Sequence, residues 1–452
     1  MSVIPTTLGT EPVGRLLRQY AVPAIIAMTA SSLYNMVDSI FIGQGVGALA
    51  ISGLAVTFPL MNLAAAFGSL VGVGASTLIS VKLGQKDYEA TRHVLGNVVS
   101  LNLLIGLVFM ILSLVFLDPI LYFFGASADT ISYARDYMEV ILYGNIITHM
   151  YLGLNAVVRS SGHPKMAMTA TIITVVLNAL LDPIFIFGFG WGIRGAAIAT
   201  ILAQVVSLSW QLYVLANDRN VVHFERGTYR LKSRIVQPIF AIGMSPFMMN
   251  ATACLIVIVI NKSLYHYGGD LAIGAYGIVN RVAFFFLMIV MGLTQGMQPI
   301  VGYNYGAKLH DRLYRALRLT IYCALVVTTA GFLVCELIPQ WIVRAFTADA
   351  ALIDQSVRAM RISSACFQII GFQMVTSNFF QCIGKAGTAI FLSLTRQLLF
   401  LLPGLFVFPL FFGLDGVWIA MPVSDFAAAV TAAVVLWRYT RRGGIHSASH
   451  AE

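Results

Sequence analysis

Apolar stretches of twenty residues or more recur along this 452-residue sequence and limit its fold more than any other feature. A helix needs about 20 mostly apolar residues to cross the ~30 Å hydrocarbon layer of a membrane. Glycine-rich breaks, such as 43–47 and 188–192, separate the stretches. We predict twelve membrane-spanning helices, at 16–43, 51–80, 94–117, 132–157, 165–187, 194–216, 236–262, 272–302, 313–338, 355–381, 388–411 and 416–437.

The composition agrees with this assignment, since 58% of the residues are hydrophobic and only 10% are charged. Soluble domains carry roughly 25% charged residues and bury at most about 75% of their surface. A soluble enzyme, a disordered protein and a nucleic-acid-binding module are therefore excluded. The alternating pattern of membrane β-strands is missing from the sequence. The fold class is therefore predicted as all-α, a polytopic membrane protein.

Lysine and arginine are distributed unevenly between the predicted loops. With the amino terminus in the cytoplasm, 20 of the 28 basic residues lie on the cytoplasmic side and six on the other. This bias predicts a multi-pass protein of the bacterial inner (plasma) membrane with both termini cytoplasmic. A cleaved signal peptide that begins with Arg15 and Arg18 is an alternative, which would remove the first span.

The two halves of the sequence resemble each other. Each half holds six predicted spans, so both enter the membrane from the same side as parallel repeats. We predict an amino-terminal bundle at 1–222, a cytoplasmic linker at 223–235 and a carboxy-terminal bundle at 236–452, with a cleft between the bundles. Chance similarity of glycine- and leucine-rich helices is the alternative. A shift of 222 residues places Gly47, Gly74, Gly84, Lys86 and Gly162 on Gly269, Gly296, Gly306, Lys308 and Gly384, and a shift of 221 places Gly192 on Gly413.

Three acids lie well inside predicted spans, where an ionised aspartate costs about 2.5–3.5 kcal/mol. They are Asp38, Asp182 and Asp425. Tyr34 lies one helical turn before Asp38, and Asn178 one turn before Asp182, so each pair shares a helix face. The first two acids belong to the same half, which favours a shared site.

Asn155 and Thr200 add neutral oxygens to that half. Carboxylate, amide and hydroxyl oxygens suit Na⁺, and they equally suit a proton because burial favours the neutral carboxylic acid. A Na⁺ site is predicted at Asp38, Asn178, Asp182 and Thr200, with H⁺ as the other coupling ion. The alternative is a pair of neutral acids that only fasten helices together.

The second half carries a different set of polar residues. Arg396 and Asp425 lie on adjacent spans and either form a buried ion pair or act in gating or substrate contact. Gln295 and Gln298 either line the cleft or bond to the backbone, and Arg281 is a further candidate for the substrate cleft. In the first half Pro23 bends the helix that carries Asp38, which makes it a candidate hinge.

Several segments resemble the multidrug and toxic compound extrusion (MATE) family. They are Leu-Tyr-Asn-Met-Val-Asp-Ser-Ile-Phe-Ile-Gly at 33–43, Leu-Gly-Gln-Lys-Asp at 83–87, Leu-Asn-Ala-Leu-Leu-Asp-Pro-Ile-Phe at 177–185, Gly-Ile-Arg-Gly-Ala-Ala-Ile-Ala-Thr at 192–200 and Pro-Ile-Val-Gly-Tyr-Asn-Tyr-Gly-Ala at 299–307. Arg-Gln-Leu-Leu-Phe at 396–400 is similar to the branch that contains the staphylococcal-type multidrug exporters. The resemblance covers essentially the whole chain.

The resemblance implies twelve helices in two pseudo-symmetric bundles around a V-shaped central cleft, and antiport of cationic drugs against H⁺ or Na⁺. It implies that Pro23 is the hinge and that some members use acids in helices 7 and 10. Those acids are missing here, and helix 7 offers Asn261 instead. The residues that the resemblance assigns to the cation site are Asp38, Asn178, Asp182 and Thr200, with Tyr34, Asn155 and Tyr137 beside them.

We therefore expect a secondary antiporter that exports lipophilic cations. The alternatives are a lipid-linked saccharide flippase, which favours a more basic cleft than Arg281 and Arg396 provide, and an uncoupled channel or receptor. The sequence lacks a Gly-Lys-Ser/Thr phosphate loop and the hydrolase motifs His-Glu-x-x-His and Gly-x-Ser-x-Gly. We expect no enzymatic activity, no cofactor other than the coupling ion, no nucleic acid and no obligate protein partner.

Overall fold

The computed structural model describes residues 7–441, and every regular element within that range is helical. Two short π-helical segments, η1 and η2, interrupt otherwise α-helical spans. The amino-terminal half contains α1 (Thr7–Thr10), α2 (Val13–Gly45), α3 (Ala48–Gly84), α4 (Tyr88–Val115), α5 (Leu117–Phe123), α6 (Ile131–Tyr143), α7 (Asn145–Ser160), α8 (Pro164–Pro183), η1 (Ile184–Gly188) and α9 (Gly192–Leu215).

The carboxy-terminal half begins with α10, which joins two predicted spans and turns at Gly269, where φ is 66° and ψ is −162°. Its elements are α10 (Ser233–Gly306), α11 (His310–Leu337), α12 (Pro339–Phe346), α13 (Ala350–Ser364), α14 (Phe367–Cys382), α15 (Ala386–Leu394), η2 (Thr395–Leu401), α16 (Leu402–Phe412) and α17 (Leu414–Arg441).

All twelve predicted spans are helical in the structure, with ends a few residues from the predicted ones. Within the described residues, nine helices are long and apolar enough to cross a membrane, and the pair α6 and α7, bent by 58°, makes a tenth. The other two predicted spans are α2 and the pair α13 and α14. The prediction of an all-helical, multi-pass membrane fold is therefore confirmed.

The turns between helices carry the sequence repeat. Lys86 and Lys308 are the non-glycine residues with positive φ in the described range, at 60° and 58°, and they are 222 residues apart. The aligned glycine pairs behave alike, since positive φ occurs at Gly47 and Gly269, at Gly162 and Gly384, and at Gly192 and Gly413. Glycine adopts positive φ without steric cost, so the same turns recur in both halves.

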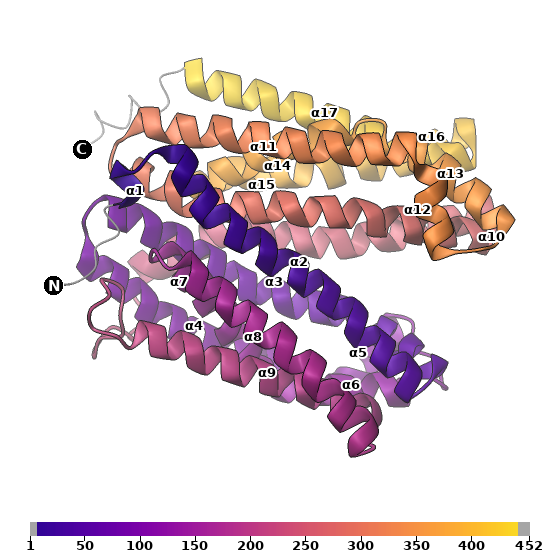
Figure 1. The fold of residues 1–452 in the computed structure, drawn as a ribbon, viewed down its shortest axis with the longest axis horizontal. Coiled ribbons are helices and arrows are strands. Elements are labelled where there is room, and N and C mark those ends of the chain that lie inside the picture. The colour runs from indigo at the N-terminus through magenta and orange to yellow at the C-terminus, as the bar shows by residue number, and fades with distance from the viewer. Residues whose placement is uncertain (1–6, 442–452) are drawn as a thin grey trace.

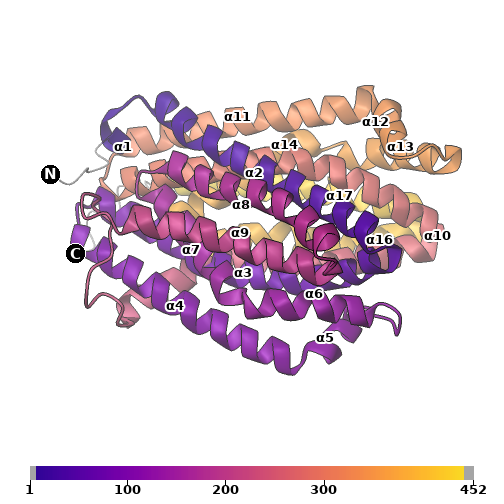
Figure 2. The same ribbon diagram turned by 60° about the horizontal axis from the view of Figure 1, so that its bottom comes forward.

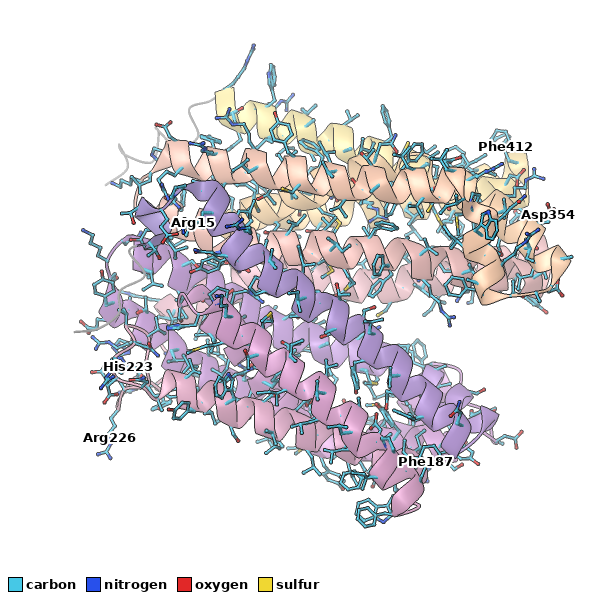
Figure 3. The ribbon with its side chains drawn as sticks, in the orientation of Figure 1. Arg15, Phe187, His223, Arg226, Asp354 and Phe412 are labelled. Atoms are coloured by element: carbon cyan, nitrogen blue, oxygen red, sulfur yellow. The ribbon has the colours of Figure 1, made fainter. Side chains whose placement is uncertain are left out.

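The helices form two bundles that meet at one end and diverge at the other. In Figure 1 the bundle of α2–α9 and the bundle of α10–α17 lie together on the left and separate toward the right, and Figure 2 shows the same helices from a second side. Figure 3 labels Arg15, His223 and Arg226 at the joined end, which we call the basic end. Phe187 and Phe412 lie on the two arms at the opposite end, which we call the open end (Figure 3).

Burial follows this shape. One large apolar core contains residues of both bundles, for example Val71 and Ile79 with Met297 and Val301. Toward the open end each bundle has a core of its own, one around Ile42 and Tyr137 and the other around residues such as Trp418. Since both bundles contribute to one core, burial does not mark a boundary between two domains. The predicted domain limits at 222 and 236 therefore stay a prediction.

The bundles touch backbone to backbone at the basic end. A Cβ atom on Gly84 of α3 would lie 2.0 Å from the carbonyl oxygen of Tyr303, and one on Gly306 of α10 would lie 2.0 Å from that of Val81. The two contacts are related by the 222-residue repeat. Small residues let membrane helices approach closely enough for such contacts.

We predict that Gly306→Ala lowers the stability of the protein. The added methyl group would collide with the Val81 carbonyl, and overpacking of this kind typically costs about 1–3 kcal/mol. The apparent melting temperature in detergent measures the effect. Gly277→Ala in the same helix is the matched control, because a Cβ atom there meets nothing within 4 Å. Equal melting temperatures for the two variants would contradict the prediction.

Candidate functional site

Two carboxyl groups from different helices meet inside the amino-terminal bundle. Asp38 of α2 is 5% exposed and Asp182, near the end of α8, is 0% exposed. Their carboxyl groups lie close enough to interact directly. An ionised carboxylate only accepts hydrogen bonds, so a hydrogen bond between the two would require a proton on one of them. The geometry suits a pair that holds one proton.

Asn178 and Thr200 extend this pair into a network. With the amide oriented to satisfy both of its ends, Asn178 donates to Asp182 Oδ2 over 2.7 Å. The amide oxygen of Asn178 then accepts from the backbone N–H and the hydroxyl of Thr200, over 3.1 and 3.0 Å. The four residues predicted to form the cation site are therefore brought together by α2, α8 and α9.

Two tyrosines complete the network around Thr200. The hydroxyl of Tyr34 lies 3.1 Å from Thr200 Oγ1. Tyr137 of α6, also a candidate for the substrate cleft, is 1% exposed and lies close to Thr200. The structure therefore places Tyr137 in the carboxyl network, where the family resemblance also put it.

The backbone next to Asp182 is irregular. Pro183 follows it and lacks an N–H group, and the π-helical segment η1 begins at the next residue. Single π-helical turns are rare and occur frequently at functional sites. The proline was visible in the sequence, whereas the change of helical pitch was not. The second π-helical segment, η2, occupies the corresponding span of the other bundle and contains Arg396.

Asn155, which we predicted to lie beside the carboxyl pair, does not reach it. Its amide donates to the carbonyl oxygen of Ala167 over 3.0 Å and lies 3.4 Å from the hydroxyl of Thr171. Thr171 precedes Asp182 by eleven residues, which is about 16 Å along a helix. Helix periodicity predicts a shared face but not the depth at which two helices meet.

The predicted cleft residues Gln295 and Gln298 lie where the bundles meet. Gln298 is 3% exposed and donates to Ser76 Oγ of α3 over 2.7 Å. Gln295 accepts from Arg159 Nη1 of α7 over 2.7 Å and donates to Met28 Sδ of α2. Gln298 is therefore a contact between the bundles in this structure, and its role as a cleft residue stays a prediction.

Toward the open end, the contact between the two bundles ends at a layer of half-buried apolar side chains. We call this layer the floor of the V, because the bundles diverge beyond it. Phe67 of α3 and Phe247 of α10 pack against each other with their rings tilted by 55° and ring centres 4.8 Å apart, one turn beyond the close contact of Leu70 with Gly243. Met28 of α2 belongs to the same layer, and its sulfur accepts a hydrogen bond from Gln295. Aromatic rings and methionine adapt to apolar molecules of varied shape.

The remaining predicted residues lie in separate places. Arg396 Nε is 2.6 Å from Asp425 Oδ1, which makes the predicted ion pair of the carboxy-terminal bundle. Arg281 of α10 is exposed and belongs to none of the ion pairs found among residues 7–441. Helix α2 continues through Pro23 without a break, so the role of Pro23 as a hinge stays a prediction.

The carboxyl network fits a proton or a hard cation. It offers two carboxyl groups, an amide and a hydroxyl, and Asp38 Oδ1 is buried without a partner among the described residues. Hard cations prefer such oxygen ligands. Across the part of the chain that the structure describes, no three His, Cys, Asp or Glu side chains gather as they do around a transition metal.

Comparisons with known proteins agree with the geometry. The family profile described as MatE matches twice, at residues 23–184 and 246–407. The multidrug export protein MepA of Staphylococcus aureus (strain N315) is 27% identical over 427 residues, which cover 94% of each chain. The MATE multidrug transporter DinF-BH, solved in complex with a small molecule, is 36% identical, with a TM-score of 0.89, and the match covers 95% of this chain and 96% of that one.

A further solved structure supports the fold alone. It is an outward-facing conformation of a multidrug resistance MATE family transporter of the MOP superfamily. It has a TM-score of 0.92 at 24% identity and covers 99% of this chain and 100% of that chain.

We predict that Asp425→Leu destabilises the protein because Arg396 then loses its carboxylate partner. The expected loss in free energy of unfolding is about 1–3 kcal/mol, below the ~3–5 kcal/mol of a fully buried pair, since 29% of the Arg396 side chain is exposed. The double variant Arg396→Met/Asp425→Leu should recover most of it. Thermal unfolding in detergent tests both, and a double variant less stable than the single one would refute the prediction.

Proposed function

The chain belongs to the MATE family of multidrug efflux transporters, and we propose that it is a secondary antiporter that exports lipophilic cations in exchange for H⁺. Its helices form the twelve-helix, two-lobed fold of that family. The observation that carries the proposal is the buried contact between the carboxyl groups of Asp38 and Asp182. Na⁺ at the same oxygens is the second candidate, favoured by the unpartnered Asp38 Oδ1.

The coupling step follows from the cost of charge in a low-dielectric interior. Two carboxylates in contact repel each other when both are ionised, so one proton stabilises the pair. Asp38 and Tyr34 lie on α2, whereas Asp182 and Thr200 lie on α8 and α9. Loss of the proton breaks the contact that holds α2 against these helices. Protonation therefore biases the position of α2, and Pro23 is the proposed hinge for its movement.

The orientation is part of the proposal. The basic end carries the excess of lysine and arginine, so we place it in the cytoplasm with both termini. The open end, where the bundles diverge (Figure 1), then faces outward. The protein lies in the plasma (bacterial inner) membrane in this assignment. This opening direction exposes the space between the arms to the outside.

The proposed substrate site is the floor of the V. Met28, Phe67 and Phe247 are half-buried and come from both bundles, so a molecule bound there contacts both arms. Ring faces attract organic cations, and methionine fits irregular apolar surfaces. DinF-BH, 36% identical to this chain, has been solved with a small molecule bound, which supports a small-molecule substrate here.

We predict that Asp38→Asn and Asp182→Asn each abolish proton-driven uptake of a fluorescent cation into everted vesicles. An amide cannot give up the proton that couples the two fluxes, and a lost coupling free energy of about 1–3 kcal/mol corresponds to ~5–150-fold. Asp354→Asn is the matched control, because Asp354 is exposed on the open end (Figure 3). Full proton-driven uptake by either site variant would contradict the coupling role.

We predict that an imposed pH gradient alone drives export in proteoliposomes, whereas an imposed Na⁺ gradient at equal pH does not. The reason is that the two carboxyl groups lie close together, an arrangement that a proton between them stabilises. Fluorescent-cation transport measures both arms. Export driven by Na⁺ alone would replace H⁺ with Na⁺ in the proposal.

A further inference from the structure

We propose that the coupling proton leaves the carboxyl pair toward the basic end through a file of buried hydroxyl and amide groups between α8 and α9. The file lies inside the amino-terminal bundle and is separate from the space between the bundles. This inference rests on the proposed function, because it requires H⁺ as the coupling ion. It assigns a transport role to Thr171, Thr174, Ser207 and Gln211.

The first observation is a polar stripe along α8. Thr171, Thr174, Asn178 and Asp182 follow one another at spacings of three, four and four residues, which places them on one helix face. All four are buried, at 8%, 8%, 0% and 0% exposure. The stripe therefore leads from the carboxyl pair toward the basic end within the protein interior.

The second observation is a matching stripe on α9, which runs antiparallel to α8. Asn178 is joined to Thr200 over 3.0 Å, and Thr174 Oγ1 donates to Ser207 Oγ over 2.7 Å. These two contacts define the register of the helices. In that register, Gln211 lies at the level of Thr171. Along α8 the step from Asn178 to Thr174 is one turn, or about 6 Å, whereas along α9 the step from Thr200 to Ser207 is two turns, or about 10 Å.

Gln211 is the strongest indication of a ligand on this path. It is 0% exposed, and neither its amide nitrogen nor its amide oxygen has a partner among residues 7–441. Buried polar groups without partners are rare and costly, and ordered water satisfies them where a site is polar. The hydroxyl of Thr171 and the amide of Asn155 lie at the same level, so a water molecule there has several partners.

Tyr151 of α7 closes the file from a third side. Its buried hydroxyl lies close to the side chains of Thr171 and Thr174. Hydroxyl groups both donate and accept, so a row of them with water between carries a proton by successive exchange of hydrogen bonds. From Asp182 to Pro164, where α8 begins, the path covers eighteen residues, or about 27 Å.

The file is interrupted in this conformation, as tight coupling requires. No side-chain hydrogen bond between described residues joins Asn178 and Thr200 to the next pair, Thr174 and Ser207. Thr200 bonds to Tyr34 of α2 instead. Seven residues, or about 10 Å along α9, separate Thr200 from Ser207, so a connection between them requires intervening water. Movement of α2 away from α9 frees the Thr200 hydroxyl to bond to such a water molecule. The position of α2 thereby controls whether the carboxyl pair is connected to the basic end.

The first experiment compares proton release with substrate binding. Thr174→Val/Ser207→Ala removes both hydroxyl groups, and we expect the maximal rate of H⁺-coupled export to fall at least about tenfold, with substrate affinity unchanged. The swap Thr174→Ser/Ser207→Thr keeps the hydroxyl groups and should restore the rate. Thr320→Val in α11 is the matched control, because its hydroxyl is buried and bonds within its own helix, at Ala316 O.

The second experiment measures access of water from the basic end. Gln211→Cys is placed in a chain whose native Cys254, Cys323, Cys335, Cys366 and Cys382 are replaced by alanine. We expect 2-aminoethyl methanethiosulfonate to label it in everted vesicles faster than Ala316→Cys. Ala316 is equally buried near the basic end but lies in an apolar core.

The outcomes separate this inference from the proposed function. If the parent protein exchanges no H⁺, the proposed function fails and the file with it. If the parent exchanges H⁺ while Thr174→Val/Ser207→Ala exports at the parent rate, only the file is refuted. Labelling of Gln211→Cys no faster than that of Ala316→Cys would equally refute it.

Discussion

The contact between the carboxyl groups of Asp38 and Asp182 is the interaction on which the proposed function depends. Two ionised carboxylates repel each other strongly in a membrane interior, so at least one proton stabilises the pair. Asp38 lies on α2 and Asp182 on α8, which packs against α9, so the contact lies between α2 and a packed pair of helices. Asn178 and Thr200 add hydrogen-bonding groups beside Asp182. In the proposed mechanism, a single proton therefore changes how α2 contacts these helices.

The scaffold around this bond is symmetric, whereas its chemistry is not. Equivalent glycines close the basic end in both halves, and the same positive-φ turns recur at Lys86 and Lys308. The carboxy-terminal bundle has no second acid pair in the described chain, and its buried acid, Asp425, is neutralised by Arg396. One bundle thus carries a buried pair of carboxyl groups, whereas the buried acid of the other is paired with an arginine.

The shape of the molecule follows from where apolar surface is shared. At the basic end one core continues through both bundles, and backbone contacts between glycines and carbonyl groups leave no room for water. At the open end each bundle buries its own core, so the arms separate without exposing either interior. The floor of the V, with Phe67 and Phe247, lies between the shared core and the two separate cores. A substrate held there is in contact with both moving parts.

The sequence by itself determined the membrane class, the twelve spans and the repeat, because span length, charge bias and glycine turns are local properties of the chain. It also identified Asp38, Asn178, Asp182 and Thr200, since buried acids and their neighbours one turn away share a helix face. The depth at which helices meet was decided only by tertiary packing. Packing placed Tyr137 near the acids, bonded Asn155 to the carbonyl oxygen of Ala167 and placed Gln298 between the bundles. Helical periodicity specifies direction around an axis, whereas height along a neighbouring helix depends on bends, π-helical turns and close glycine contacts that no single segment encodes.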